Sequence, residues 1–533
     1  MAVHRSVWYQ LLGCVLLQLH HVSSLDIGIP ITAPSKAAPI LRDHVSYSLE
    51  QDRWLDWSGT TSKNDFFHNT MENIRDLTGL PPRIRIGANS EDRTHFNPNI
   101  EFAQLVFPAP TYVIPYPEAT TIVVGDGYYA ATRFLPRDTQ VTWGLNLGSN
   151  NLTAAFLMAQ SISKAFKSPV ISDANIKLEA IEIGNEPDLY GNNGHRAPGY
   201  STSQYIQEWT TFASKVTDVL GISPTSYTKF LGGSMVVSSG TTSGWGPQAL
   251  FAQGLLRSHA GSLISTISQH RYSGSFCTGS PVLLQDLMTK TTIRGNISVY
   301  AADIAATRAL GLDYVLGETN SFACHGAPGV SNVAGAALWS LDYLLYAAQA
   351  GISRIFFHQG IGFKYNFVQP VTLYRDPVDS QPLATPRSPH VQPQYYATII
   401  AAEATGRSGN TRLFDLPVND PRISAYAFYE GNAVTKAIFI DSTGYYKHAS
   451  APGTRRRTRI HPFFHTGSNA PTRMVIKRLH IPFSDDTSGL SWGGITYETS
   501  NGRPRGNLTV ETVDVSAGFD IHATEVVMAS FLR

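Results

Sequence analysis

Hydrophobic and polar positions follow one rhythm over most of the chain. Between about residues 45 and 408, short runs of apolar and β-branched residues alternate with longer segments whose apolar residues recur at helical spacing. Strands are expected at 45–50, 83–87, 140–146, 181–183, 230–233, 264–272, 312–316 and 353–358, and the main helices at 64–77, 152–166, 203–220, 297–310, 334–350 and 394–404. Strands that alternate with helices predict a parallel α/β architecture, and eight of them predict a (β/α)8 TIM barrel.

The rhythm changes after about residue 409. Short alternating runs are separated there by Asn, Gly, Pro and Asp, which is typical of an antiparallel β-sandwich. The expected organisation is therefore a catalytic-type barrel at 45–408 and a C-terminal β-sandwich at 409–533. The proline-rich segment 25–44 has no place in the barrel and is expected to add a strand to the sandwich.

The first residues have the pattern of a secretory signal. His4 and Arg5 precede an apolar run at 7–19, and small residues near Ser24 offer a cleavage site, so residues 1–24 are excluded from the fold. No later stretch has 18 uninterrupted apolar residues. A secreted, extracellular protein that does not span a membrane is expected, and it is expected to be a monomer.

Composition limits the classes of molecule that the protein is expected to bind. The chain has 533 residues, of which 15% are charged, and its net charge of +1 gives no global attraction to nucleic acid or to a membrane surface. The sequence shows no metal-ligand cluster, phosphate loop or nucleotide fingerprint, so neither a metal nor a cofactor is expected.

Cysteines and glycosylation triplets fit an oxidising compartment. Cys14 leaves with the signal, and the remaining Cys277 and Cys324 favour one disulfide over two separate buried thiols. Both follow predicted strands that would be neighbours in a barrel, so the bridge would join two loops at its mouth. N-glycosylation triplets begin at three asparagines, Asn151, Asn296 and Asn507.

Two strand-like runs end in an acidic residue. Glu186 closes the run at 181–188 (IEIGNEPD), and Glu318 lies in the run at 312–321 (LDYVLGETNS). One such glutamate alone is more often ion-paired or a cap. Two on barrel strand ends point across the mouth and are the minimum equipment for cleaving a glycosidic bond with retention, at about 5 Å apart. Glu318 is expected to be the nucleophile and Glu186 the acid/base, while the amide of Asn185 suits a sugar 2-hydroxyl.

These segments resemble clan A of the glycoside hydrolases, and most closely family 79, the β-glucuronidases and heparanases. The resemblance is carried by residues 46–50 (SYSLE), 85–87 (RIG), 183–188 (IGNEPD), 317–321 (GETNS), 327–328 (AP) and 339–342 (WSLD). It implies a retaining β-glucuronidase that pairs a barrel with a β-sandwich and acts on carbohydrate bearing glucuronic acid, with or without a 4-O-methyl group.

The resemblance also implies further site residues. Tyr272 matches a tyrosine that hydrogen-bonds the nucleophile, and the segment 362–365 (GFKY) matches the region that holds the sugar carboxylate. Tyr365 is the first candidate there and Lys364 the second, against the alternative of a solvated lysine. Asp92 and Asn89 are expected either to bind outer hydroxyls or to serve the structure.

The sequence departs from the family pattern after the nucleophile segment. Residues 322–325 (FACH) stand where relatives tend to have tyrosine or glycine, which alters the rim of the site. The absence of an obvious excised linker favours an exo-acting, single-chain enzyme. The alternatives are an endo-acting heparanase-like hydrolase, a clan A β-glycosidase for a neutral sugar, and a carbohydrate-binding protein without catalysis.

Overall fold

The computed structural model describes residues 23–279, 283–448, 455–465 and 470–532, so the expected signal segment 1–24 lies almost wholly outside the described residues. Eight parallel strands close into a barrel in which each strand pairs with the next along the chain and the last pairs with the first. They are β3 (Val45–Glu50), β4 (Ile84–Gly87), β8 (Gln140–Leu145), β9 (Lys177–Ile183), β10 (Lys229–Met235), β11 (Ile264–Ser275), β12 (Asp313–Ala323) and β13 (Arg354–Gln359). The predicted barrel is confirmed.

Helices surround the barrel. The longer ones are α2 (Asp65–Thr78), α4 (Leu152–Phe166), α7 (Thr202–Leu220), α10 (Lys290–Ser298), α11 (Ala301–Ala309), α12 (Ala334–Gln349) and α13 (Tyr395–Thr405), and the shorter ones are α1 (Trp54–Ser58), α3 (Asp126–Ala130), α5 (Pro169–Ser172), α6 (Tyr190–Asn193), α8 (Pro247–Ala252) and α9 (Leu284–Met288). Within the described parts of the chain, no helix has the length and apolar character needed to cross a bilayer.

The single helix expected at 297–310 is wrong. The structure breaks it at Val299 and Tyr300, between α10 and α11. The phenol of the buried Tyr300 donates to the carbonyl oxygen of His270 in β11 at 2.9 Å, which anchors the break against the barrel. The position of the break between α10 and α11 is therefore set by a tertiary contact. The spacing of apolar residues along a helix does not encode such a contact.

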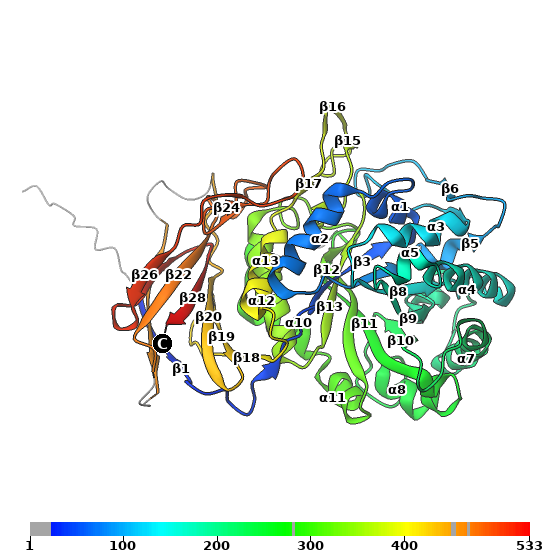
Figure 1. Cartoon of the computed structure of the whole chain (residues 1–533), viewed down its shortest axis with the longest axis horizontal. Helices are drawn as coiled ribbons and strands as arrows, with labels where there is room; N and C mark the ends of the chain where they lie inside the picture. The colour runs from blue at the N-terminus through cyan, green and yellow to red at the C-terminus, as the bar shows by residue number, and fades with distance from the viewer. Residues whose placement is uncertain (1–22, 280–282, 449–454, 466–469, 533) are drawn as a thin grey trace, which may run out of the picture.

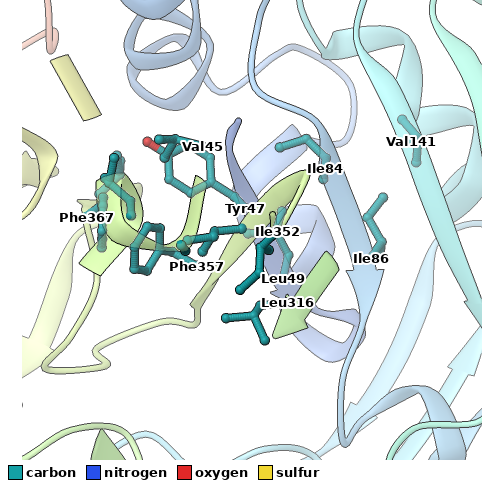
Figure 2. Packing of buried hydrophobic residues seen from close by; sticks show 14 of the residues in the cluster. Val45, Tyr47, Leu49, Ile84, Ile86, Val141, Leu316, Ile352, Phe357 and Phe367 are labelled. Carbon is teal, nitrogen blue, oxygen red and sulfur yellow. The ribbon is translucent and has the colours of Figure 1, made fainter. Parts of the chain in front are cut away.

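Alternation along the barrel strands separates two environments. In β3, Val45, Tyr47 and Leu49 pack outside the barrel with apolar side chains from β4 and β13, as Figure 2 shows. The opposite face of β3 carries Ser48 and Glu50, which hydrogen-bond or ion-pair with polar groups inside the barrel. The interior is filled at one level by a small apolar cluster of Ala180, Leu231, Val315 and Phe356. Polar and charged side chains occupy the rest of the interior that we describe below.

The C-terminal domain is a sandwich of a large and a small sheet. The large sheet contains β2 (Ala38–Pro39), β18 (Thr411–Asp415), β19 (Ile423–Glu430), β20 (Ala433–Asp441), β28 (Glu525–Leu532), β22 (Arg473–His480), β23 (Ser491–Trp492), β24 (Ile495–Thr496), β25 (Arg505–Gly506) and β26 (Glu511–Asp514); the small sheet contains β1 (Ser23–Ile29), β21 (Arg457–Phe464) and β27 (Phe519–His522). The blue N-terminal strand β1 lies among the orange and red strands in Figure 1 and pairs in parallel with β21.

The large sheet buries both of its faces. In β19, Ala425 and Ala427 belong to the core between the two sheets, whereas Tyr426 and Phe428 belong to the core shared with the barrel. On the barrel side, Asp342 of α12 accepts a hydrogen bond from Ser424 at 2.8 Å and from Tyr426. Helices α12 and α13 lie between the barrel strands and this sheet (Figure 1). The two domains therefore share one continuous hydrophobic core.

Two insertions extend the barrel. A small sheet of β5 (Thr94–Phe96), β7 (Thr121–Val124) and β6 (Ala103–Val106) follows β4. After β13 come β14 (Val368–Gln369), which pairs with β17 (His390–Val391), and the hairpin of β15 (Leu373–Arg375) and β16 (Pro382–Arg387), which projects at the top of Figure 1. The phenol of Tyr116 joins the insertions, since it lies within hydrogen-bond distance of both backbone groups of Arg375.

Candidate active site

The two glutamates meet inside one end of the barrel. Glu186 follows the last residue of β9, and Glu318 lies in β12. One carboxylate oxygen of each glutamate and a ring nitrogen of His270 all lie within 4.8 Å of one another. Retaining glycosidases place their carboxyl groups about 5–5.5 Å apart, whereas inverting ones leave about 6.5–9.5 Å for a water molecule. The separation matches direct attack by one carboxylate.

The backbone that presents Glu186 is tightly constrained. Glu186 has φ 50° and ψ 54°, a left-handed conformation that is uncommon for a residue with a side chain. Its N–H donates to the carbonyl oxygen of Ser234 at 2.9 Å. Gly184, with φ 81°, allows the turn, because a Cβ there would lie 2.5 Å from the phenol oxygen of Tyr190. Neighbouring strands thus fix the direction of the Glu186 side chain.

His270 in β11 holds the Glu186 carboxylate. Its Nδ1 lies 2.9 Å from Oε1 of Glu186, and the ring is completely buried. The other ring nitrogen has no hydrogen-bond partner among the described residues. The sequence analysis did not single out His270, although it precedes Tyr272 by two positions and must therefore share its face of the strand.

Glu318 is held as a carboxylate. Its Oε1 accepts a hydrogen bond from the phenol of Tyr272 at 2.8 Å, and its Oε2 accepts one from Arg85 at 2.8 Å. Burial alone would raise the pKa of Glu318, but the charges of His358, His270 and Arg85 and the bond from Tyr272 hold that pKa well below its usual range. An ionised, fully buried carboxylate is suited to nucleophilic attack.

Arg85 in β4 connects the floor of the site to its centre. Its guanidinium donates to both carboxylate oxygens of Glu182 and to Oδ1 of Asn185 at 2.8 Å, besides Glu318. Burial would lower the pKa of Arg85. The Glu182 and Glu318 carboxylates outweigh burial and hold that pKa well above its usual value. In the sequence, Arg85 stands between two isoleucines of a predicted barrel strand. This segment contributes to the family resemblance, but it does not by itself assign Arg85 a role in the site.

A second buried acid lies beside this ion pair. Glu91 is fully buried, and burial followed by the carboxylates of Glu182 and Asp92 holds its pKa well above the usual range. Its carboxyl lies over Gly144, where any side chain would overlap it. Burial and the neighbouring carboxylates therefore favour the protonated form of Glu91.

His358 in β13 completes the charged interior. Its Nε2 lies 3.3 Å from Oε1 of Glu50, and its Nδ1 lies 3.8 Å from Oε2 of Glu318. Burial would lower the pKa of His358, but the two carboxylates outweigh burial and raise it. These carboxylates therefore favour the protonated ring of His358, which lies near Oε2 of Glu318, whereas Tyr272 bonds Oε1.

The residues expected to bind sugar hydroxyls take different places. Asn185 is buried against Arg85, and its amide nitrogen lies 3.4 Å from Oδ1 of the exposed Asn89. Asp92 accepts hydrogen bonds from the backbone N–H groups of Leu147, Gly148 and Asn185, and from the phenol of Tyr190. Both oxygens are used to fix the loops around the site, which favours the structural alternative, while the hydroxyl-binding role stays a prediction.

Tyr365 and Lys364 have different neighbours. The buried ring of Tyr365 lies 6.0 Å from that of Tyr272 and 6.2 Å from that of His358, which places it beside the nucleophile. Lys364 is buried, but its ammonium lies over the Phe276 ring, 5.7 Å from the centroid. Among the described residues we find no hydrogen bond to this ammonium, and its side chain lines a separate cavity.

Glu186, His270 and Glu318 approach closely enough to ligate a cation. The Arg85 guanidinium, however, already occupies Oε2 of Glu318, and a buried positive charge at 2.8 Å opposes a metal ion there. The group therefore fits an acid–nucleophile pair better than a metal centre.

Comparisons with known proteins agree with this geometry. A family model for the glycosyl hydrolase family 79 C-terminal beta domain matches residues 425–528. The chain is 28% identical over 523 residues to a β-glucuronidase of Aspergillus niger, which covers 93% of this chain and 91% of the relative. It is 28% identical over 528 residues to a β-glucuronidase of Neurospora crassa, with 91% and 89% covered. The chain is therefore similar to glycoside hydrolase family 79 in its C-terminal domain and to these two β-glucuronidases over most of its length.

Solved structures share the fold of this chain. A 4-O-α-L-rhamnosyl-β-D-glucuronidase from Fusarium oxysporum, with 23% identity, superposes with a TM-score of 0.76 over 95% of this chain and 100% of its own. A family 51 arabinofuranosidase from Xanthomonas axonopodis pv. citri gives a TM-score of 0.59 at 13% identity, covering 96% of this chain and 100% of its own. At these identities the likeness supports the architecture alone.

The rim of the site includes the residues that follow β12. The disulfide between Cys277 and Cys324, which the sequence favoured, joins the loops after β11 and β12. The next residue, His325, lies 2.8 Å from Oε1 of Glu118 and stacks on Phe363 with ring centroids 3.6 Å apart. The departure from the family pattern therefore forms a linked rim between three loops.

The asparagines of the three glycosylation triplets differ in exposure. Asn151 and Asn507 are exposed. Asn296 is 8% exposed, and its side-chain oxygen accepts a hydrogen bond from Arg271 at 2.6 Å. Burial disfavours a glycan at Asn296 in the folded protein, and glycosylation at all three asparagines stays a prediction.

Proposed function

We propose that this glycoside hydrolase is a retaining β-glucuronidase that releases β-linked glucuronic acid from glycans. The observation that carries the mechanism is the approach of the Glu186 and Glu318 oxygens within 4.8 Å, in a cluster that keeps Glu318 ionised. The names of the two similar fungal enzymes support the substrate class.

In the first step, Glu318 attacks the anomeric carbon and forms a glycosyl–enzyme ester while the bond to the leaving oxygen breaks. Glu186 gives its proton to that oxygen. The two acids differ in the way these roles require, since Glu318 receives hydrogen bonds from Tyr272 and Arg85, whereas Glu186 faces only His270 among the described side chains.

In the second step, Glu186 takes a proton from water, and the resulting oxygen nucleophile attacks the anomeric carbon. The ester bond breaks and Glu318 returns as a carboxylate, so the product keeps the configuration of the substrate. The Glu186 side chain is 13% exposed against 8% for Glu318, which gives the acid/base the better access to water.

We assign recognition of the sugar carboxylate to Tyr365. Its phenol is a hydrogen-bond donor, and burial followed by the Glu318 charge raises its pKa well above the usual value, so it keeps its proton. Lys364 has other neighbours and is assigned a different role below. We also propose that the protein is secreted, with cleavage near Ser24, because it has the signal pattern and a disulfide. Exo action is part of the same proposal.

The test is hydrolysis of p-nitrophenyl β-D-glucuronide and p-nitrophenyl β-D-glucoside by the purified protein, by Glu318→Ala and by Tyr365→Phe. We expect a strong preference for the glucuronide, its loss in Glu318→Ala, and a selective rise of KM for the glucuronide in Tyr365→Phe. Hydrolysis of the glucoside alone would support the catalytic roles of the two glutamates but would show that the substrate is a neutral sugar. Failure to hydrolyse either, with cleavage of heparan-type polymers, would favour an endo-acting enzyme.

A further inference from the structure

A cavity of about 580 Å³ lies between the barrel and the C-terminal domain. Its walls come from the segment after β13, from the β15–β16 hairpin and the residues that follow it, and from sandwich loops at 487–488 and 498–500. This volume is within the range of sites that bind small ligands, about 300–1,000 Å³. Neither Glu186 nor Glu318 is among the lining residues.

The cavity has a buried end and an open end. Phe363, Lys364 and Leu373 line it and are buried, whereas Arg387 and Ser488 line it and are exposed. A ligand can therefore enter from solvent past the exposed residues as far as the Lys364 side chain, whose covered ammonium must turn into the cavity to meet it.

Lys364 is a buried cation without a hydrogen-bonding partner. The residue is 1% exposed, and in the described parts of the chain its ammonium makes no hydrogen bond or salt bridge. The acid that acts on it is Asp376, but the Asp376 carboxylate accepts a hydrogen bond from the Val378 N–H at 2.6 Å and lies 3.4 Å from Arg387. The Phe276 ring gives the ammonium only a weak contact at 5.7 Å.

An unpaired buried ammonium is unfavourable unless an anion completes it. Burial lowers the pKa of Lys364 to about 8, so the group is still largely charged at neutral pH. A carboxylate that enters the cavity would replace the lost hydration with a charge-assisted hydrogen bond.

The remaining lining suits a sugar. Side-chain hydroxyls of Thr487, Ser488 and Ser500 line the cavity beside apolar groups such as Leu373 and Val391. Hydroxyl groups and flat apolar surfaces are the two features that a pyranose ring presents. A carboxylate on such a ring would reach the ammonium.

We propose that the junction cavity is a second carbohydrate site, which binds a uronic acid residue of a glycan through a hydrogen-bonded ion pair between the sugar carboxylate and the ammonium of Lys364. The site is separate from the glutamate pair and does not depend on the proposed hydrolysis. It lies directly behind the catalytic wall, because Phe363 lines the cavity and its ring lies 5.8 Å from that of His358.

Crystals of the full chain soaked in D-glucuronate test the location. The sugar is expected in the junction cavity with its carboxylate on Lys364. It should be missing from that cavity in Lys364→Met crystals, while any glucuronate at the glutamates stays. A cavity that is empty in the wild type, or equally occupied in Lys364→Met, overturns the proposal.

Calorimetric titration with D-glucuronate tests the affinity in solution. We expect at least a tenfold loss for the junction site in Lys364→Met, little change in Lys364→Arg, and no loss in Lys447→Met, whose lysine is exposed. D-Glucose is the neutral control and should bind much more weakly. Equal binding of glucose and glucuronate would overturn the role of the ion pair.

Two further measurements keep the test independent of folding and of catalysis. Ser488→Trp changes only an exposed residue at the open end and should block the cavity, so it decides the matter if Lys364→Met fails to fold. Binding should weaken above about pH 8, as Lys364 loses its proton, and should not weaken there in Lys364→Arg. Loss of glucuronide hydrolysis with this binding intact would overturn the proposed function and leave the second site standing.

Discussion

Arg85 joins Glu318 to Glu182 by hydrogen bonds from one guanidinium, with the contact to Glu318 at 2.8 Å. All three side chains are at most 8% exposed. A single cation therefore balances the nucleophile and a carboxylate deeper in the barrel. The charge state of the catalytic centre depends on a residue that would not itself react.

Arg85→Met should weaken both folding and activity. Removing one partner of a buried ion pair leaves its carboxylates unpaired, at a cost of about 3–5 kcal/mol. The pKa of Glu318 should rise, because Arg85 is one of the charges that lower it. Since the nucleophile must be ionised, the acidic limb of the pH profile of kcat/KM should move to higher pH. Urea unfolding and pH–rate profiles measure the two effects.

Arg85→Lys is the matched control for charge. It keeps a cation but cannot make the forked contacts with Glu182 and Glu318. We expect a smaller shift of the acidic limb than in Arg85→Met. An unchanged limb in both variants would contradict the role of Arg85.

Glu186→Gln should reduce glucuronide hydrolysis by about 10²–10⁴-fold, the usual contribution of a general acid–base group. The loss should be smaller for leaving groups that need little protonation, such as p-nitrophenol, than for an alkyl aglycone. Equal losses for all leaving groups would point to a structural effect instead.

Glu91→Gln should stabilise the protein at neutral pH. The pKa of Glu91 is raised in the folded state, so its contribution to stability is present below the unfolded pKa and is lost as pH rises toward the folded pKa. Each pH unit in this window costs about 1.4 kcal/mol, and a neutral amide removes that dependence. Denaturant unfolding between pH 5 and pH 8 tests this, with Glu101→Gln at an exposed position as control. A stabilisation that does not grow with pH would show that Glu91 is ionised in the fold.

Loss of the Cys277–Cys324 disulfide should destabilise the protein by about 2–4 kcal/mol, because the bridge closes a loop with a sequence separation of 47. The paired variant Cys277→Ser, Cys324→Ser should also lower kcat/KM, since His325, which lies 2.8 Å from Glu118, directly follows Cys324. Thermal unfolding and kinetics of this variant measure both. Unchanged kinetics with lowered stability would separate the rim from the catalytic centre.

Glycan mapping by mass spectrometry should find carbohydrate at Asn151 and Asn507 after expression in a secreting eukaryotic host. Asn296 should be unmodified, because its side chain is buried against Arg271. A glycan at Asn296 would require a different arrangement of α10 against β11.

The barrel and the positions of the two glutamates could be predicted from the sequence because each strand carries its own local signal. Runs of β-branched residues and their periodicity define β3 and β12, and the strand ends place Glu186 and Glu318 without any knowledge of packing. The interior charges are different in kind. Arg85, His270 and His358 come from three strands, and only the barrel register shows that they meet at the glutamates.

Side-chain direction was the other missing piece. Lys364 and Tyr365 are neighbours in the sequence, but one lines the domain junction and the other lies beside Tyr272. Asp92 looked available for sugar, although backbone amides from two loops use its oxygens. The direction of each side chain depends on contacts with loops that are distant in the sequence. A local sequence pattern carries no information about those contacts.

The parallel pairing of β1 with β21 has a consequence for biosynthesis. The strand made first finds its partner only when most of the chain has left the ribosome, which at about 5–20 residues per second means a wait of roughly tens of seconds. Throughout that time the N-terminal segment has no sheet to join. The small sheet can therefore close only after synthesis is nearly complete, and a chain that stops early exposes this strand to chaperones and proteases.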